Sequence, residues 1–120
     1  MTTKVLCVDD DKSLLEIAKT YLEIAHSIEV KTADSADSAL RLLADEEFDT
    51  IVSDQNMPEM TGIELIRVLR NRGDNTPFIL FTSCSRREAL KDAIMSGVDM
   101  FLAKDGDIRA QFMELGHIIR

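Results

Sequence analysis

The sequence predicts an α/β fold in which helices cover both faces of one parallel β-sheet. Short apolar runs alternate with longer segments of helical period five times along the chain, and this alternation is typical of parallel strands joined by crossover helices. The length of 120 residues suits one compact domain and is too short for two. We therefore expect residues 1–120 to form a single domain with one core and one main site.

The first half of the chain predicts two strands and two helices. Val5 to Val8 is the first apolar run. Apolar residues at the i, i+3 and i+4 spacing of a helix face follow, namely Leu14, Ile17, Ala18, Tyr21, Leu22 and Ala25. Ser13 and Glu16 offer this helix a capping box at its start. The alternating run from Ile28 to Ala33 predicts an edge strand, and a helix from about Ser35 to Asp45 follows it.

The middle of the chain predicts two further strands with a helix between them. Thr50 to Ser53 is a short β-like run. Thr61 and Glu64 form a candidate capping box for the third helix. Pro77 then introduces a fourth strand, Phe78 to Thr82.

The last part of the chain completes five strand-helix units. A helix from about Arg86 ends near Gly97, a natural C-terminal cap. Met100 to Ala103 supplies the fifth strand, and a final helix begins at about Ile108. Its inner face is formed by Phe112, Leu115 and Ile119. Because crossovers between parallel strands are right-handed, we expect a doubly wound, flavodoxin-like sheet of order 2-1-3-4-5, with ligands at the carboxyl ends of its strands.

Polar side chains follow or end four of the five predicted strands. Asp9 and Asp10 follow the first strand, Asp54 follows the third, Thr82 ends the fourth and Lys104 follows the fifth. In the predicted strand order these four carboxyl ends are neighbours, so the side chains should converge on one crevice. An aspartate in such a place is often only a helix cap or a turn former, and we interpret Asp11 in that way.

Three converging carboxylates predict a bound cation. At an effective dielectric of about 20, each close pair repels by about 4 kcal/mol. Lys104 supplies one positive charge, and a hard divalent cation, Mg²⁺ or Mn²⁺, suits the remaining oxygen ligands. Our hypothesis is that Asp10, Asp54 and the backbone carbonyl of Asn56 ligate the metal, while Asp9 acts mainly through water.

Four separated motifs resemble the receiver domains of two-component response regulators. They are the acidic pair after Val8, the segment from Ser53 to Gly62, the run from Leu80 to Ser83, and the Lys104 that ends Phe101-Leu102-Ala103-Lys104. The resemblance covers the whole chain, and four motifs in the right order are more specific than the acidic pair alone.

The resemblance implies a role for each residue of the constellation. Asp54 would be the phosphorylation site and would accept a phosphoryl group from a histidine kinase or a phosphotransfer protein. Asp9 and Asp10 would help to hold Mg²⁺, and Thr82 and Lys104 would contact the phosphoryl group. We therefore expect a signalling domain and not an enzyme, beyond self-phosphorylation and self-dephosphorylation.

The resemblance also implies a switch with an output surface. Thr82 and the aromatic Phe101 would move on phosphorylation and change the binding of a downstream protein through the fourth helix, fifth strand and fifth helix. Receivers usually have a proline after the lysine, across a cis peptide, whereas Asp105 follows Lys104 here. A cis bond without proline costs roughly 2.5–4 kcal/mol, so we expect a trans peptide between these residues.

Composition excludes several classes of partner. The formal charge of −8, from 22 acidic and 14 basic residues, disfavours direct binding of nucleic acid. We expect neither a signal peptide nor a membrane span.

Cys7 and Cys84 lack any C-x-x-C spacing and are expected to be buried, reduced thiols, which favours a cytoplasmic location. The domain would act alone or as part of a larger regulator or hybrid kinase.

Three alternative functions compete with that of a receiver domain. A phosphohydrolase of the haloacid-dehalogenase kind uses the first aspartate of a D-x-D pattern, which residues 9–11 contain, but it needs an acidic pair after the fourth strand, where this chain has Thr82-Ser83-Cys84-Ser85. A pure interaction module would not need the whole constellation. The third alternative is a flavodoxin, but the acidic loop after the first strand would repel a flavin phosphate.

The remaining candidate residues receive structural interpretations. His26 and His117 are expected to lie alone at helix ends, in surface or capping roles. The methionines are interpreted as core filler and loop packing and not as a recognition surface.

Overall fold

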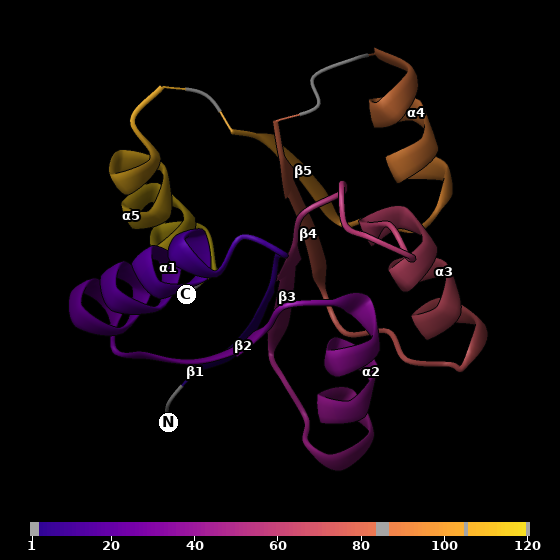
Figure 1. The fold of residues 1–120 in the computed structure, drawn as a ribbon, viewed down its shortest axis with the longest axis horizontal. Coiled ribbons are helices and arrows are strands. Elements are labelled where there is room, and N and C mark those ends of the chain that lie inside the picture. The colour runs from indigo at the N-terminus through magenta and orange to yellow at the C-terminus, as the bar shows by residue number, and fades with distance from the viewer. Residues whose placement is uncertain (1–2, 84–86, 105, 120) are drawn as a thin grey trace.

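A computed structural model of the protein describes residues 3–83, 87–104 and 106–119. The elements along the chain are β1 (Thr3–Val8), α1 (Lys12–His26), β2 (Ile28–Ala33), α2 (Ala36–Asp45), β3 (Thr50–Ser53), α3 (Gly62–Asn71), β4 (Phe78–Thr82), α4 (Arg87–Met95), β5 (Met100–Ala103) and α5 (Ile108–Ile119). Helices α1 and α5 cover one face of the sheet, and α2, α3 and α4 cover the other (Figure 1). This confirms the doubly wound α/β fold.

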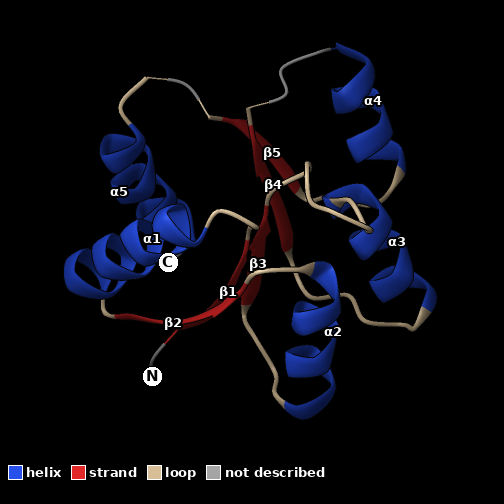
Figure 2. Cartoon of the chain, viewed as in Figure 1, coloured by secondary structure: helices blue, strands red, loops and turns tan. Residues whose placement is uncertain are grey.

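The sheet has the predicted order β2-β1-β3-β4-β5, and its neighbouring strands all pair in parallel (Figure 2). The register places Val8 opposite both Ala33 and Ser53, and Thr82 opposite Ala103. The residues that follow these positions therefore leave the sheet at one common edge. β2 forms one margin of the sheet, as its alternating pattern predicts.

Two buried clusters, one on each face of the sheet, hold the layers together. Alternate residues of β1 point to opposite faces. Val5 and Cys7 pack under α1 and α5, whereas Leu6 and Val8 pack under α2, α3 and α4. β3 and β4 are buried along their whole length, which is typical of central parallel strands.

The thiol of Cys7 lies within the first of these clusters, as the sequence predicts for this residue. Burial raises its pKa to about 12, with a smaller contribution from the negative charge of Asp9. The thiol is therefore protonated at neutral pH and fills space as a small apolar group. The same prediction for Cys84 lies outside the described residues.

One predicted helix cap is wrong and another is confirmed. α1 begins at Lys12, and its N-cap is Asp11, whose carboxylate accepts the N–H of Leu14 at 3.2 Å. The Ser13 and Glu16 capping box does not form, because Asp11 is also a strong N-cap and starts the helix two residues earlier. Asp11 thus has the capping role that its sequence context indicates. At α3 the capping box of Thr61 and Glu64 is present as predicted.

The prediction that His26 and His117 lie alone at helix ends is wrong. Their rings meet in a T-shaped pair with centroids 4.6 Å apart, and His26 is only 6% exposed. His26 Nε2 donates to the carbonyl oxygen of Met113 at 2.9 Å. Gly116 permits this contact between α1 and α5, because a Cβ there would overlap the imidazole of His26. The meeting of two helix ends distant in sequence is not visible in local spacing.

The interpretation of the methionines as core filler holds for some of them and fails for others. Met57 is buried, and Met60 is partly buried against the same cluster. Met95, Met100 and Met113 are 78%, 37% and 45% exposed. They lie on α4, β5 and α5, so these three elements carry exposed apolar side chains.

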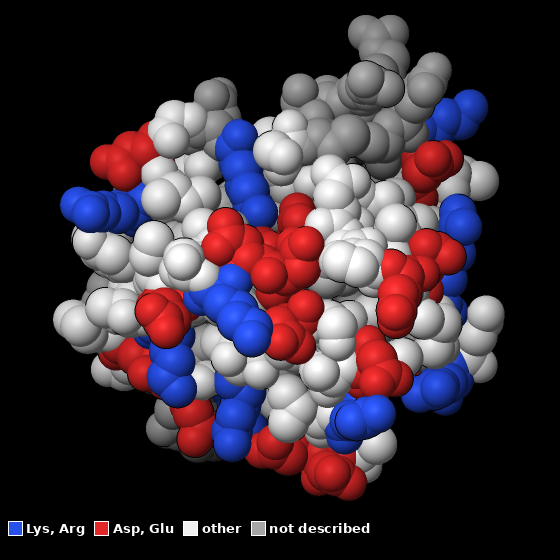
Figure 3. Space-filling model, viewed as in Figure 1, with Lys and Arg blue, Asp and Glu red and all other residues white. Residues whose placement is uncertain are grey.

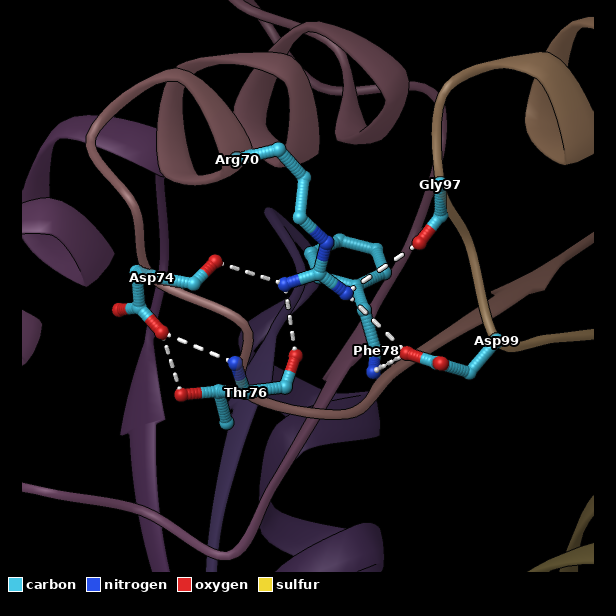
Figure 4. A network of polar contacts seen from close by, with 6 residues as sticks. All are labelled: Arg70, Asp74, Thr76, Phe78, Gly97 and Asp99. Carbon is cyan, nitrogen blue, oxygen red and sulfur yellow. Dashed lines mark hydrogen bonds and ion pairs between the residues drawn. The ribbon is translucent and has the colours of Figure 1, made fainter.

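Arg70, in the last turn of α3, ties together the loops at the other end of β4 (Figure 4). Its guanidinium donates to the carbonyl oxygens of Asp74 and Thr76 at 2.9 Å each, and to that of Gly97 at 3.2 Å. It also donates to Asp99 Oδ2 at 3.1 Å. The same carboxylate oxygen accepts the N–H of Phe78 at 2.8 Å, so one network fixes the start of β4 and the connection into β5.

We expect Arg70→Ala to lower the free energy of unfolding by about 2 kcal/mol, because it removes several charge-assisted hydrogen bonds at once. Arg41 is the matched control, since its pair with Asp37 is exposed on both sides and Arg41→Ala should change stability by less than about 0.5 kcal/mol. Urea denaturation of both variants checks this. Equal, small losses would show that the Arg70 network contributes no more than a surface pair.

Candidate functional site

The structure brings the predicted constellation together at the carboxyl edge of the sheet. Lys104 Nζ lies 2.9 Å from Asp9 Oδ2 and 3.5 Å from Asp54 Oδ1. One carboxylate oxygen from each of Asp9, Asp10 and Asp54 lies within 4.8 Å of the others. Thr82 is fully buried, and its hydroxyl acts on the Asp54 carboxylate from close by, where it lowers the pKa of that group. Residues far apart in sequence thus share one crevice, as the strand order predicts.

The surface above this crevice is acidic. Figure 3 shows acidic side chains gathered near the middle of the face it presents, over the loops that follow β1 and β3, with basic side chains at their border. Asp9 and Asp54 are 7% and 8% exposed, whereas Asp10 is open to solvent. Two of the three carboxylates are therefore buried, and that of Asp10 is accessible from solvent.

Both oxygens of Asp9 are already engaged by the protein. Oδ1 accepts the N–H of Asp11 at 3.0 Å, and Oδ2 pairs with Lys104. Its own N–H donates to the carbonyl oxygen of Ala33 at 3.1 Å, which extends the pairing of β1 and β2 by one residue. Asp10, by contrast, is exposed next to it. This division suits the hypothesis that Asp10 binds a metal directly and Asp9 through water.

Asp54 is held by its backbone at the end of β3. Its N–H donates to the carbonyl oxygen of Val8 at 2.9 Å, which extends the pairing of β1 and β3 by one residue. Its carbonyl oxygen accepts the Ser53 hydroxyl at 2.9 Å. The first residue of α3, Gly62, packs against the same carbonyl so closely that a Cβ there would overlap it. The carboxylate is therefore presented from a fixed main chain.

The environment raises the pKa of Asp54 above its ordinary value of 3.8. Burial is the largest cause, and the charge of Asp9 adds to it. Lys104, the Thr82 hydroxyl and the N–H of Gln55 act in the opposite direction and do not cancel the effect. The carboxylate form of Asp54 thus lacks full compensation from the protein.

The donor set fits a divalent cation. The three carboxylates are hard oxygen donors, which Mg²⁺ and Mn²⁺ prefer. Lys104 is the cation that pairs with this cluster among the described residues, so three negative charges face one positive charge. One divalent cation would therefore neutralise the excess of two negative charges. The contribution of the Asn56 carbonyl stays a prediction; its side chain is exposed in the loop after Asp54.

Several predictions at the edge of the site are not tested. Phe101 lies in β5 opposite Leu80 and is partly buried against the cluster beneath α2, α3 and α4, and its role as a switch stays a prediction. Cys84 lies outside the described residues. So does Asp105, and with it the predicted trans peptide after Lys104.

Sequence reasoning missed two residues that shape the site. Gln55 accepts the N–H of Ile63 at 2.8 Å through its side chain. Phe81 lies beneath Lys104, whose Nζ is 5.6 Å from the ring centroid. Both positions stand next to predicted site residues, but neither residue type carries a pattern that would reveal its contact.

Comparison with known proteins places the chain in a family. Residues 5–114 match the response regulator receiver domain. The chain belongs to the response regulator receiver domain family, which is a family of signalling domains. The haloacid-dehalogenase alternative gains no support from this match.

Individual relatives agree with the family assignment. The chain is 34% identical to the chemotaxis protein CheY of Pseudomonas aeruginosa over 103 residues, covering 84% of this chain and 83% of that protein. It is 37% identical to the response regulator protein FleR of the same species over 111 residues, or 92% of this chain and 23% of FleR. The chain therefore spans about a quarter of the length of FleR.

Solved structures share the fold over the whole chain. The receiver domain of Francisella response regulator 1452 is 32% identical with a TM-score of 0.87, covering 98% of this chain and 96% of that one. The chemotaxis response regulator CheY4 of Vibrio cholerae is 29% identical with a TM-score of 0.88, and all of both chains is covered. Among the described residues of the present protein, no helix combines the length and the apolar character that crossing a membrane requires.

The raised pKa of Asp54 predicts a pH-dependent effect of Asp54→Asn in metal-free protein. At about pH 7 the buried carboxylate costs stability, so the asparagine variant should be the more stable. As the pH falls through the raised pKa toward 3.8, the wild-type carboxyl takes up its proton in the folded state and this advantage should shrink. Urea unfolding in a chelating buffer at several pH values measures it. An advantage that grows as the pH falls would mean that the pKa is lowered instead.

Proposed function

We propose that residues 1–120 act as a phospho-accepting receiver domain in which Asp54 takes a phosphoryl group from a histidine kinase or a phosphotransfer protein. The observation that carries the proposal is the position of Lys104 Nζ, which contacts Asp9 and Asp54 together at the edge where Thr82 also meets Asp54. A merely structural ion pair would not need a third carboxylate and a buried hydroxyl at the same point.

The chemistry follows from the carboxylate and its neighbours. An oxygen of Asp54 forms a bond to the phosphorus of a phosphohistidine while the P–N bond breaks, and the electron pair returns to the histidine ring. Lys104 neutralises charge on the transferring oxygens, because its ammonium already lies beside the Asp54 carboxylate. Asp10 and Asp54, with Asp9 behind them, would hold Mg²⁺ or Mn²⁺, which when bound offsets the charge that the carboxylates and the phosphoryl group accumulate.

A change at Thr82 would carry the signal outward. Its hydroxyl acts on the Asp54 carboxylate and would donate to the phosphoryl group once Asp54 is modified. Thr82 ends β4 opposite Ala103, so a shift of its loop reaches β5, and Phe101 lies two residues before that contact. The exposed Met95, Met100 and Met113 on α4, β5 and α5 suit a downstream protein that binds there. The formal charge of −8 argues against nucleic acid as the direct target.

A cytoplasmic location belongs to the same proposal. Its support is the reduced, buried state predicted for the cysteines, which the burial of Cys7 suits.

Phosphorylation of Asp54 is testable with a small phosphodonor. Incubation with Mg²⁺ and acetyl phosphate should add one phosphoryl group to the intact mass of the wild type, and Asp54→Ala should abolish the gain. Asp37→Ala is the matched control, because Asp37 is an exposed aspartate on α2, and it should be labelled like the wild type. Labelling that survives in Asp54→Ala but disappears in Asp9→Asn would refute the proposal and favour a phosphohydrolase that uses the first aspartate.

A further inference from the structure

The N-terminus of α3 is satisfied by two different groups of residues. The first four N–H groups of a helix have no partner within it. Thr61 and Glu64 satisfy two of them, since the N–H of Thr61 donates to Glu64 Oε1 at 3.0 Å and that of Glu64 to Thr61 Oγ1 at 3.2 Å. The other two belong to Gly62 and Ile63, and both donate to Gln55.

Gln55 accepts these two N–H groups through different atoms. Gly62 donates to its main-chain carbonyl oxygen at 3.0 Å, and Ile63 donates to its side-chain Oε1 at 2.8 Å. Gln55, at the start of the loop of residues 55–61, is therefore joined to the first residues of the helix that follows the loop. A helix N-terminus could be capped by its own Thr61 and Glu64 alone, with water for the rest, so the contribution of Gln55 is an additional constraint.

The same residue also lies beside the Asp54 side chain. Its main-chain N–H acts on the Asp54 carboxylate and lowers the pKa of that group, against the larger effect of burial. On the other side of the peptide, Gly62 packs against the Asp54 carbonyl oxygen with no room for a Cβ. Asp54 is thus held between the two ends of the loop that Gln55 closes.

We propose that Gln55 is a positioning residue for the phosphoacceptor. Its side chain fixes the N-terminus of α3 against the loop, and the fixed loop orients the Asp54 carboxylate and presents Asn56 to the cation. This inference rests on the proposed function, because it assigns Gln55 a role in the same site. It requires an acceptor atom at the reach of Oε1, which glutamate also has and methionine lacks.

The experiment compares two substitutions of Gln55 with a control that removes a similar cap elsewhere. Gln55→Met keeps the length of the side chain and removes the strong acceptor, and Gln55→Glu keeps the acceptor. Ser35→Ala removes the side chain that caps α2, where Ser35 Oγ accepts the N–H of Ser38 at 3.1 Å. The wild type and the three variants are measured for hydrogen exchange of the Ile63 amide, for Mg²⁺ affinity by calorimetry and for the rate of labelling by acetyl phosphate.

We expect Gln55→Met to speed exchange of the Ile63 amide and to weaken Mg²⁺ binding by about tenfold, the effect of losing a residue that orients a ligand. Labelling should slow even at saturating Mg²⁺, because the Asp54 carboxylate is less well oriented. Gln55→Glu should protect the Ile63 amide and bind Mg²⁺ at least as well as the wild type. Ser35→Ala should leave Mg²⁺ affinity and labelling unchanged.

Two outcomes would overturn the inference. Gln55→Met could free the Ile63 amide and still bind Mg²⁺ and accept phosphoryl groups like the wild type, in which case Gln55 only caps α3. Ser35→Ala could weaken Mg²⁺ binding as much as Gln55→Met, in which case the loss is general destabilisation. A wild type that neither binds Mg²⁺ nor accepts a phosphoryl group is a separate result, since it refutes the proposed function itself.

Discussion

The mutual repulsion of three carboxylates at one edge of the sheet is the constraint on which the site depends. Oxygens of Asp9, Asp10 and Asp54 lie within 4.8 Å of one another. At an effective dielectric of about 20, each such pair costs roughly 4 kcal/mol, which is a large part of the stability of a small domain. Lys104 offsets part of this cost through its contacts with two of the three. The remaining imbalance is the basis of the proposed cation site. Burial, which is the largest cause, and the charge of Asp9 together raise the pKa of Asp54.

The fold tolerates this imbalance because its stabilising contacts lie elsewhere. Both apolar clusters run along the faces of the sheet, and the Arg70 network fixes the loops at the end of β4 that is remote from Thr82. The carboxyl edge can therefore hold carboxylates that repel one another, while the opposite edge and the core stabilise the fold. Such a division is common in parallel α/β sheets, where ligands bind outside the carboxyl ends of the strands.

The sequence was sufficient for the strand order and for the convergence of the site, because both follow from periodicity and from the geometry of parallel crossovers. Two predictions were wrong for different reasons: two residues compete to cap α1, and two helices far apart in sequence pack together. Asp11 and Ser13 are both good N-caps, and only the path of the chain after β1 decides between them. The pairing of His26 with His117 depends on a glycine of α5 that no pattern relates to α1. Gln55 lies within the motif from Ser53 to Gly62, but nothing in that motif reveals its contact with the N–H of Ile63, which arises where α3 follows the loop after β3.

Paramagnetic broadening of amide signals by Mn²⁺ locates a bound cation without reference to activity. If the three carboxylates hold a cation, amides at Asp10, Asp54 and Gln55 broaden first and recover when Mg²⁺ is added in excess. The segment from Asp45 to Asp49 is also rich in carboxylates but lies before β3 and serves as an internal control. Broadening centred on that segment, or none at the carboxyl edge, would show that Asp9, Asp10 and Asp54 do not hold a cation.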